Sequence, residues 1–544
     1  MFELQNKIIH TVENLSGHKV TEFSRWERKP YLADGSIVSE FWDLIEEATA
    51  VLLIGDYDVD GICAVFIIAT AIHNVFPDKP IRIRIPRRFS EGYGIHDQII
   101  DEIRQKDPAG TLIITADNGI NEKYKLEKLE QEGYKVAITD HHEAKELPRV
   151  SFVINPVMEN MDIPLCGNFW CGAGVALKLI EQYVDEETKS AAEVLAAIAT
   201  IADCVPLVEG NWVLVKKALK RIRAKKAPFQ ISALIDEMGQ DIRYCNENTI
   251  GFYVAPALNA PGRLYDKGGA MVLSYLLSPN LTKAREIVSI NNRRKQLRDE
   301  QYDVVRYKIR EEHLSDRCPI WIAIPGLHEG IIGILAGRIV EDYGVPAIVL
   351  TMKEDGTFKG SARTTEDINI YEYLSSLDVV FISLGGHQGA AGMTISKEEL
   401  DKARLSELPH PPIKDKMKEY IQINMGDIPA AEKEIAKYSP YGECNPAPMF
   451  SVLVDMQSDM VRMAGRSEEH LIIEDRKGEW QVTHFHHNPN NLEDKERFYV
   501  AGTIEMRSFN GTSTPALNGA VAYDMTEGKE MNDLIMENIQ QTEI

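Results

Sequence analysis

The sequence predicts an α/β protein: a mostly parallel sheet, a smaller α/β unit after it, and a β-barrel near the C-terminus. Strand-length apolar segments alternate with helical segments through the first 150 residues, which is typical of right-handed crossovers in a parallel sheet. Residues 282–313 lack Gly and Pro and predict one long helix between the two units. From about residue 417, short β patterns are separated by turn residues, as a small barrel requires.

Each element has a local signal, because apolar runs predict buried strands and longer amphipathic or apolar segments predict helices. In the first unit the strands are predicted at 50–54, 81–85, 111–116 and 135–139, and the helices at 61–76, 95–105 and 123–133. In the second unit the strands are predicted at 319–324, 346–350 and 379–384, and a helix at 331–344. The barrel strands are predicted at 449–456, 470–475, 479–485 and 497–509.

Length and composition are those of an ordinary globular protein, with 544 residues of which 44% are hydrophobic and 26% charged. No apolar run is long enough to cross a membrane, and the N-terminus lacks the pattern of a signal peptide. We therefore expect a cytoplasmic protein without a membrane partner. The seven cysteines are scattered and form no CxxC pair, so neither a disulfide framework nor a zinc site is indicated.

The net charge of −23, taken alone, argues against a nucleic-acid partner. The basic residues are nevertheless clustered in three stretches, at 81–89, 216–226 and 291–298. Each stretch could be a solvated face of a helix or strand. Together they suggest a local basic track, and the acidic remainder would limit indiscriminate binding to polyanions.

Acidic residues and histidines follow three of the predicted strands. They are Asp56, Asp58 and Asp60 after the first strand, Asp117 after the third, and Asp140, His141 and His142 after the fourth. The carboxyl ends of parallel strands share one edge of the sheet, which is where open α/β sheets bind ligands. An acidic loop tip would explain any single motif, but the coincidence of three favours a ligand site.

Carboxylates with imidazole and without thiolate suit Mn²⁺ or Mg²⁺ better than a structural zinc. These residues are more than one ion needs, so two ions are expected, as in sites that displace a leaving group at phosphorus. Asp203 is a further candidate ligand, because it follows an apolar helical stretch in which an unpaired carboxylate would be costly. The alternative for Asp203 is a helix N-cap.

The motifs GDYDVDG (55–61), ADNGI (116–120), TDHHE (139–143) and TIADCVPL (200–207) resemble, in this order, the four motifs of the DHH phosphoesterase family. Later stretches resemble the RecJ branch of that family, which consists of single-strand-specific exonucleases. They are NAPGRL (259–264), HEGIIGILAGRI (328–339), KGSAR (359–363), GGHQGAAG (385–392) and PYGECNPAPMF (440–450).

The resemblance implies a division of the chain into domains. It comprises a DHH catalytic domain with an N-terminal extension at 1–280, a long connecting helix at 281–318, a DHH-associated domain at 319–408, an OB-fold domain at 417–527 and a polar tail at 528–544. The resemblance therefore extends over both predicted α/β units and the barrel.

The resemblance also implies residue roles. The metal ligands would be Asp58, Asp60, Asp117, His141 and Asp203, with Asp56 as an additional ligand. Asp117 would bridge the two ions, while His141 and Asp203 would hold the second ion. His142 would meet the scissile phosphate and Asp140 would orient an imidazole. One departure is Ile54, which stands where many DHH phosphoesterases have a histidine.

A substrate-binding set follows from the same resemblance and consists of Arg88, Asn259, Arg263, Ser361, Arg363 and His387. Ser361 and Arg363 are two residues apart on a predicted strand, so they face one way and could hold a terminal phosphate. For the glycine-rich stretch around His387, a tight turn between a strand and a helix is the alternative.

These implications lead to a metal-dependent 5′-to-3′ exonuclease that degrades single-stranded DNA to mononucleotides in DNA repair and recombination. We expect a monomer, with a single-strand-binding protein and a helicase as candidate partners besides the DNA. One alternative is a DHH phosphodiesterase acting on short oligonucleotides or cyclic dinucleotides, which would not need the barrel. The other is a non-catalytic replication scaffold, which would not need the acidic motifs.

Overall fold

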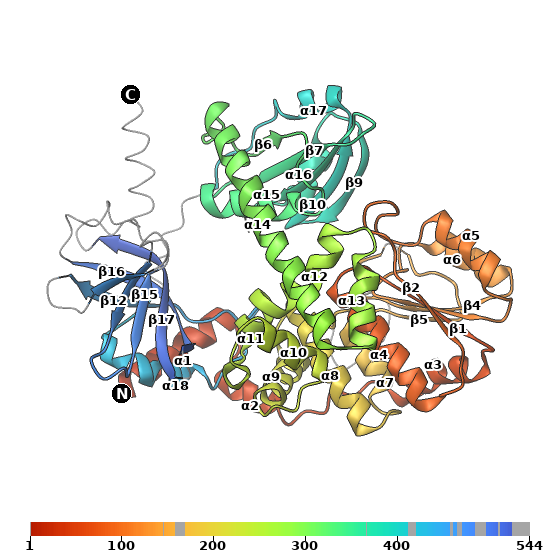
Figure 1. The fold of residues 1–544 in the computed structure, drawn as a ribbon, viewed down its shortest axis with the longest axis horizontal. Coiled ribbons are helices and arrows are strands. Elements are labelled where there is room, and N and C mark those ends of the chain that lie inside the picture. The colour runs from red at the N-terminus through yellow and green to blue at the C-terminus, as the bar shows by residue number, and fades with distance from the viewer. Residues whose placement is uncertain are drawn as a thin grey trace.

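The protein is described from a computed structural model, which contains three β-sheets connected by helices (Figure 1). The structure describes residues 2–144, 146–157, 169–365, 367–411, 420–456, 461–464, 470–484, 497–509 and 512–524. The predicted polar tail at 528–544 lies outside the described residues.

The first sheet is parallel throughout and has the strand order β2-β1-β3-β4-β5. Its strands are β1 (Val51–Gly55), β2 (Ile81–Arg84), β3 (Leu112–Ala116), β4 (Lys135–Thr139) and β5 (Phe152–Ile154). The four predicted strands are thus confirmed to within one residue at each end, and β5 is an addition. From β1 the chain crosses to β2 on one side and then to β3 on the other. The order therefore reverses between β1 and β3, and α/β sheets bind ligands at such a switch point.

Helices cover both faces of this sheet because alternate strand residues are apolar on both sides. Leu53 of β1 belongs to the core shared with α3, α4, α7 and α8, whereas Ile54 belongs to the core shared with α5 and α6. Burial of one such side chain contributes about 1.5–3 kcal/mol. The helices of this lobe are α3 (Gly35–Glu47), α4 (Val59–Val75), α5 (Asp97–Lys106), α6 (Lys123–Gln131), α7 (Gly172–Ile180), α8 (Glu186–Ala202), α9 (Glu209–Arg223), α10 (Phe229–Glu237), α11 (Glu247–Thr249), α12 (Ala255–Leu264) and α13 (Gly268–Leu277).

Two short segments interrupt the helices of this lobe. They are a 3₁₀ turn, η1 (Ile242–Tyr244), and a π-helix, η2 (Ile250–Val254), which runs directly into α12. π-helical turns are rare and occur frequently at functional sites.

The predicted long helix is confirmed as α14 (Leu281–Glu311), whose first turn is capped by the side chain of Asn280. Its N-terminal half packs into the first lobe through Ile287, and its C-terminal half packs into the second lobe through Val305 and Ile309. Because one continuous helix contributes to both cores, α14 fixes the separation of the two lobes (Figure 1).

The second lobe contains a mixed sheet with the order β6-β7-β8-β10-β9. Its elements are β6 (Ile320–Ala323), α15 (Ile332–Tyr343), β7 (Ala347–Met352), β8 (Phe358–Arg363), α16 (Ile370–Ser376), β9 (Phe381–His387), β10 (Ala390–Ile395) and α17 (Lys397–Ala403). The stretch 385–392 forms the antiparallel β9–β10 hairpin, in which His387 pairs with Ala390. The alternative of a turn between a strand and a helix is therefore wrong.

A seven-stranded sheet with the order β11-β12-β16-β17-β15-β14-β13 forms the C-terminal β domain, residues 421–524, where the barrel was predicted. Its elements are β11 (Ile421–Ile423), η4 (Met425–Asp427), α18 (Ile428–Ile435), β12 (Phe450–Asp455), β13 (Val461–Ala464), β14 (His470–Glu474), β15 (Gln481–His484), β16 (Arg497–Phe509) and β17 (Thr512–Asp524). The antiparallel pair β16–β17 is its longest ladder.

The N-terminal helix α1 (Phe2–Ser16) packs against this C-terminal β domain, and the next helix, α2 (Val20–Trp26), packs against α9 of the first lobe (Figure 1). Phe23 and Trp26 share a core with Trp212 of α9 and with strand residues such as Phe450. The two ends of the described chain are therefore joined through a common hydrophobic core. The β domain is docked on the first lobe by this core.

Replacing Trp212 by phenylalanine should lower the free energy of unfolding by about 0.5–1.5 kcal/mol, because the carbonyl of Tyr438 would lose one of its two buried hydrogen bonds and keep the one from Asn445. The Trp212 indole donates to that carbonyl at 3.1 Å and packs against Phe23 with ring centroids 5.3 Å apart. Urea unfolding measures the effect, with Tyr307→Phe on the exposed side of α14 as the control. An unchanged unfolding midpoint for Trp212→Phe would contradict the docking role.

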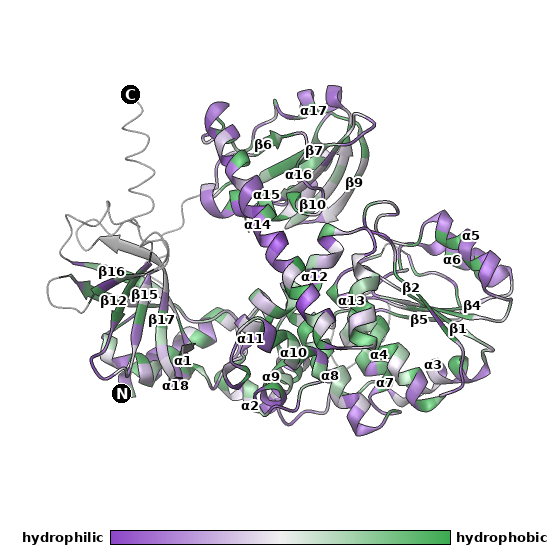
Figure 2. Cartoon of the chain, in the orientation of Figure 1, coloured by the Kyte–Doolittle hydropathy of each residue, from purple (hydrophilic) through white to green (hydrophobic). Residues whose placement is uncertain are grey.

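Apolar residues collect on the strands and on the inner faces of the helices, while outer faces are hydrophilic (Figure 2). Among the described residues, no helix combines the length and the apolar character needed to cross a membrane.

Candidate metal centre and phosphate-binding pocket

The predicted acidic residues meet at the carboxyl edge of the parallel sheet. Asp58 is the N-cap of α4, where its side chain accepts the backbone N–H groups of Asp60 and Gly61. Asp60 follows in the first turn of α4 and accepts the N–H groups of Gly172 and Ala173, at the start of α7, at 2.6 and 2.7 Å. Two helix N-termini thus hold these carboxylates in place, as expected for negative charge at the positive end of a helix.

Asp117 follows β3 and lies at the centre of the cluster. Its φ of 62° is in the left-handed region, which Asp tolerates better than most residues. A Cβ atom on Gly172 would lie 2.4 Å from the Cβ of Asp117, so only glycine fits at the start of α7. The close approach of α7 therefore fixes the position of Asp117.

Three overlapping groups of side chains could each hold a metal ion, with ligand atoms within 4.8 Å of one another. They are Asp56, Asp58 and Asp117; Asp60, His141 and Asp203; and Asp117, His141 and His142. Asp117 belongs to two groups, which fits a bridging position. Asp60 groups with His141 and Asp203, so it lies on the side that the resemblance assigned to the second ion.

His141 connects the groups. Its Nε2 atom lies 3.0 Å from Asp117 Oδ1, 3.5 Å from Asp60 Oδ2 and 3.6 Å from Asp203 Oδ2. Burial lowers the pKa of His141, which favours the neutral imidazole that binds metal ions.

The carboxylates repel one another strongly. Burial, followed by the charge of neighbouring carboxylates, raises the pKa of Asp117 and Asp56 well above the ordinary value and that of Asp203 to about 8. One oxygen of Asp56 is buried without a hydrogen-bond partner. Such a set of oxygen donors is stable in its charged form only beside cations, so the residues present fit a pair of divalent ions.

Asp140 and His142 form a pair beside this cluster. Burial alone would raise the pKa of Asp140, but hydrogen bonds from the His142 ring and from the backbone N–H groups of Ile120 and His142 keep it low. Burial would lower the pKa of His142, but the 2.7 Å hydrogen bond and the charge of Asp140 raise it to about 9. The contact with Asp140 therefore favours the positively charged form of the His142 ring.

Ile54 lies in β1 and is fully buried against α5 and α6. It offers no ligand atom, so the candidate ligands of the first group are the carboxylates of Asp56, Asp58 and Asp117 alone.

Adding Mn²⁺ to EDTA-treated protein should raise the melting temperature, because a cation relieves the repulsion among the carboxylates. At a metal concentration a hundred times the dissociation constant, binding contributes about 2.7 kcal/mol. Differential scanning fluorimetry with and without Mn²⁺ measures the shift, and the same titration on Asp203→Asn should give a smaller one. A melting temperature that does not change when Mn²⁺ is added would contradict the proposed metal site.

Replacing Gly172 by alanine should cost about 1–3 kcal/mol of stability, since overpacking forces Asp117 or α7 to move. The affinity for Mn²⁺ should fall as well, because Asp117 would leave its position. Gly337→Ala in α15 is the matched control, because a Cβ atom there meets nothing within 4 Å. Thermal melting and Mn²⁺ binding are measured for both variants, and equal behaviour of the two would refute the packing argument.

The predicted arginines meet beside the metal cluster. Arg88 stacks over the ring of Tyr57 at 4.8 Å, and its loop is anchored by the side chain of Asp266 through the backbone of Phe89 and Ser90. Burial, together with the positive charges of Arg88, Arg294 and Arg363, lowers the pKa of Arg263 to about 9. Cations crowded in this way require an anion, such as a phosphate, as their partner.

Ser361 and Arg363 face the same side of β8, where an Arg363 Nη atom donates to the Ser361 hydroxyl at 3.1 Å. The first turn of α15 lies against both, because a Cβ atom on Gly333 would lie 2.9 Å from Ser361 Oγ and 3.1 Å from an Arg363 Nη atom. A helix N-terminus adds further N–H donors for an anion. The pocket for a phosphate therefore combines residues of both lobes.

Two predicted substrate residues have other contacts. Asn259 accepts the backbone N–H of Val59 at 3.2 Å, so it supports the start of α4 beside Asp58. His387 lies exposed at the β9–β10 turn, where its Nδ1 accepts the N–H of Gly389. Neither contact involves Arg88, Arg263, Ser361 or Arg363, which form the candidate phosphate pocket.

Sequence reasoning missed several residues of the site. The Tyr93 hydroxyl lies 3.4 Å from both ring nitrogens of His142. Asn118 is buried, and neither atom of its side-chain amide has a hydrogen-bond partner. The sequence could have indicated Asn118, because it directly follows Asp117 in the second motif. Tyr93 lies in a loop without a motif, so no sequence pattern indicated it.

Ion pairs neutralise part of the three basic stretches. Seven of their fifteen Lys and Arg residues are paired with acids: Arg82 with Asp107 and Glu102, Arg84 with Glu91 and Glu102, Lys216 with Glu27, Lys217 and Arg221 with Glu193, Arg293 with Glu300, and Arg298 with Asp299. Arg88 and Arg294 are two of the other eight, which form no ion pair with a carboxylate among the described residues.

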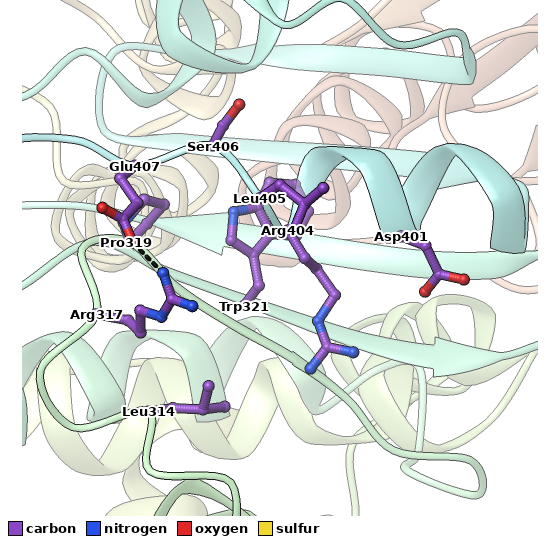
Figure 3. Close-up of a pocket in the computed structure, with 9 residues that line it drawn as sticks. All are labelled: Leu314, Arg317, Pro319, Trp321, Asp401, Arg404, Leu405, Ser406 and Glu407. Carbon is purple, nitrogen blue, oxygen red and sulfur yellow. Dashed lines mark hydrogen bonds and ion pairs between the residues drawn. The ribbon is translucent and has the colours of Figure 1, made fainter.

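A cavity of about 290 Å³ in the second lobe also contains arginines but differs from the phosphate pocket (Figure 3). Arg317 is paired with Glu407, and Arg404 is paired with Glu312. Because both cations are already neutralised, this cavity lacks the unpaired positive charge that a phosphate site needs.

Three family models match the chain. The N-terminal domain of the DHH family matches residues 50–205, the DHHA1 domain matches 320–407, and the RecJ OB domain matches 423–519. The matches follow the order of the first lobe, the second lobe and the C-terminal β domain.

Several proteins of similar sequence are named RecJ. The single-stranded-DNA-specific exonuclease RecJ of Escherichia coli (strain K12) is 30% identical over 447 residues, or 76% of each chain. RecJ of Bacillus subtilis (strain 168) is 30% identical over 493 residues and covers 87% of this chain, while the match spans 61% of that relative's length.

Solved structures agree with the fold. RecJ from Thermus thermophilus in complex with Mn²⁺ superposes with a TM-score of 0.72 at 22% identity, covering 96% of this chain and 78% of that chain. An exonuclease RecJ bound to manganese superposes with a TM-score of 0.54 at 26% identity, covering 68% and 91%. With three quarters of a relative matched at 30% identity, the chain belongs to the RecJ family of DHH phosphoesterases.

Proposed function

We propose that this protein is an exonuclease that degrades single-stranded DNA from its 5′ end to mononucleotides with two divalent ions, Mn²⁺ or Mg²⁺. The observation that carries the proposal is the unpaired arginine pocket beside the acidic cluster. The positive charge of Arg88 lies close enough to Asp58 to act against the rise in the pKa of Asp58. The negative charge of Asp58 acts in turn to raise the pKa of Arg263. A role in DNA repair and recombination is carried over from the family resemblance.

The arrangement suggests what each part does. The pocket of Arg88, Arg263, Ser361 and Arg363 would hold a terminal phosphate and so bring the next phosphodiester to the acidic cluster. Asp56, Asp58, Asp60, Asp117, His141 and Asp203 would hold the ions. Bound there, two divalent ions supply charge neutralisation at phosphorus and lower the pKa of an attacking water.

His142 has a separate part in this scheme. Asp140 accepts the Nδ1–H group and fixes the orientation of the ring. In the imidazolium form the other ring nitrogen also carries a proton, which would point toward the substrate. A protonated imidazole stabilises negative charge that develops on a phosphate oxygen. Asp140 therefore acts through His142, as a positioning residue.

The direction of degradation is tested with a single strand labelled at one end. With Mn²⁺ present, a 5′ label should appear first as a mononucleotide, whereas a 3′ label should remain on shortening strands. Release of mononucleotide from the 3′ label first would overturn the proposed direction.

The same assay separates the alternatives. A duplex with blunt ends should resist cleavage, and a cyclic dinucleotide should remain intact. Turnover of the cyclic dinucleotide without turnover of single strands would support the small-substrate phosphodiesterase. Binding of single strands without any turnover in Mn²⁺ or Mg²⁺ would support the scaffold.

A further inference from the structure

A turn of the second lobe, residues 328–331, lies at the junction of the two lobes. It directly precedes α15, and the N–H of Ile331 closes it by donating to the carbonyl of His328 at 2.9 Å. On the side of α14, the side-chain oxygen of Gln301 accepts the N–H of His328 at 3.1 Å. The turn is therefore anchored to the helix that both lobes share.

Two glycines bring this segment against the phosphate pocket. A Cβ atom on Gly330 would overlap the carbonyl oxygen of Arg263, so only glycine fits at this position. Gly333, three residues later, is the position where a Cβ atom would crowd the two pocket residues of β8. The segment 328–333 therefore lies against pocket residues of the first lobe on one side and of the second lobe on the other.

The ring of His328 adds two polar contacts at this junction. Its Nδ1 atom accepts the N–H of Gly330 at 3.1 Å, which leaves the proton of the neutral ring on Nε2. The ring also forms a hydrogen bond to the backbone of Leu264, the residue that directly follows Arg263. Leu264 in turn packs against the core of the second lobe. His328 thus joins the end of α12 to the turn before α15.

The same ring contacts the loop that carries Arg88. It meets the ring of Phe89 edge to face, with centroids 5.5 Å apart. Burial lowers the pKa of His328 and the charge of Arg88 adds to this effect, whereas the hydrogen bond to the backbone of Leu264 and the charge of Glu329 oppose it. The neutral ring is favoured, so His328 adds no further positive charge beside the crowded arginines.

We propose that His328 is a positioning residue, which holds the first-lobe arginines of the phosphate pocket at a fixed distance from Ser361 and Arg363. It acts through the backbones of Leu264 and Gly330 and does not contact the phosphate. The inference rests on the proposed function and adds to it the residue that assembles the two halves of the pocket. A terminal phosphate is held from both lobes only if these halves keep their relative position.

Two other roles fit His328 less well. In the part of the chain that the structure describes, His328 belongs to none of the candidate groups of metal ligands. A direct contact with a phosphate would need a free N–H group on the ring. The Nδ1 atom instead accepts from Gly330, and the Nε2 proton is directed to the backbone of Leu264. With both ring nitrogens used within the protein, the ring positions its neighbours.

The test compares 5′-phosphorylated and 5′-hydroxyl single strands as substrates of the full-length protein in Mn²⁺. In His328→Ala, the ratio of kcat/KM on these two substrates should fall by about 2- to 13-fold, the range expected for the loss of one net hydrogen bond. Most of the loss should appear in KM. His410→Ala is the matched control, because the His410 ring also contacts a backbone carbonyl, that of Asp316, at 3.1 Å.

Conservative variants separate hydrogen bonding from packing. His328→Asn can still accept the N–H of Gly330, and His328→Gln can still donate to the backbone of Leu264. Each should therefore keep more of the preference for the 5′-phosphate than His328→Ala does. His328→Phe keeps a ring against Phe89 but forms neither hydrogen bond, so it should behave like His328→Ala. These variants also allow the comparison if His328→Ala melts too low to be assayed.

A double-mutant cycle tests whether His328 acts through the pocket. Once Arg363 is removed, the second lobe has lost a cation of the pocket, so the distance between the two halves matters less. His328→Ala should therefore reduce the preference much less in an Arg363→Ala background than in the wild type. The shift in melting temperature caused by Mn²⁺ should be equal in His328→Ala and the wild type, because the candidate metal ligands are untouched.

Three outcomes overturn the inference. An unchanged preference in His328→Ala, or a wild-type preference in His328→Phe, would show that the hydrogen bonds of the ring do not assemble the pocket. Additive losses in the double-mutant cycle would show that His328 acts outside the pocket. Failure of the wild type to cleave single strands or to prefer the 5′-phosphate would instead overturn the proposed function, and this failure is detected before any variant is compared.

Discussion

Replacing Asp117 by asparagine should abolish cleavage at every Mn²⁺ concentration while the binding of single strands survives. Asparagine keeps the size of the side chain and tolerates the left-handed φ of 62°, so the loss would report the missing charge. Asp117 belongs to two of the three candidate ligand groups, and added metal cannot replace a ligand shared by both ions. The loss should exceed the 10- to 100-fold that is typical when an outer-shell partner of a metal ligand is removed.

In EDTA the same substitution should not lower the melting temperature. Without metal, Asp117 is a buried carboxylate whose pKa is raised by burial and by its acidic neighbours, so Asp117→Asn should melt at or above the temperature of the wild type in EDTA. In Mn²⁺ the wild type should melt at a higher temperature than the variant. Asp97→Ala, an exposed carboxylate at the start of α5, is the control for both measurements. Recovery of cleavage at millimolar Mn²⁺ would show that Asp117 does not bridge the ions.

The parallel sheet and its acidic edge were predictable because local and long-range signals agree there. Continuous apolar runs mark β1, β3 and β4, and each run stops at a polar motif whose position on the shared edge follows from parallel pairing. The metal cluster could therefore be anticipated from strand ends without any knowledge of side-chain distances.

The grouping of ligands was not predictable in the same way. Asp60 turns toward His141 and Asp203 because α7 approaches it and donates two N–H groups, and this approach depends on Gly172, more than a hundred residues along the chain. Contacts between segments so far apart leave no trace in local periodicity.

Phe252 and Arg294 show the same limit. Phe252 is part of an apolar helical pattern, which predicts burial in a core, but it lies in a π-helical turn and is 70% exposed. Arg294 belongs to a basic stretch in which two of the four cations, Arg293 and Arg298, form ion pairs. The burial of Arg294 depends on which other segments pack beside α14, and local periodicity does not show this.

The packing of α1 on the C-terminal β domain is a third case. The amphipathic pattern of α1 indicates a buried face but not its partner, and the partner strands lie more than four hundred residues away. The hydrogen bond from Trp212 to Tyr438 is part of the same long-range docking.

Replacing Arg363 by alanine should reduce the preference for a 5′-phosphate over a 5′-hydroxyl strand by about 5- to 150-fold, because a bidentate arginine contact discriminates by roughly 1–3 kcal/mol. The metal cluster has no intrinsic direction, so the selection of the 5′ end must come from a pocket that prefers a terminal phosphate. Arg363 is the residue of that pocket on the second lobe, where Ser361 and the start of α15 hold it.

The measurement is kcat/KM on 5′-phosphorylated and 5′-hydroxyl strands for the wild type and the variant. Arg404→Ala is the matched control, because Arg404 lies in the same lobe but is paired with Glu312. The loss should appear mainly in KM, since the ligands of the metal cluster are untouched. If the ratio for Arg363→Ala equals that of the wild type, recognition of the 5′ end lies elsewhere in the chain, and the direction of degradation must have another structural origin.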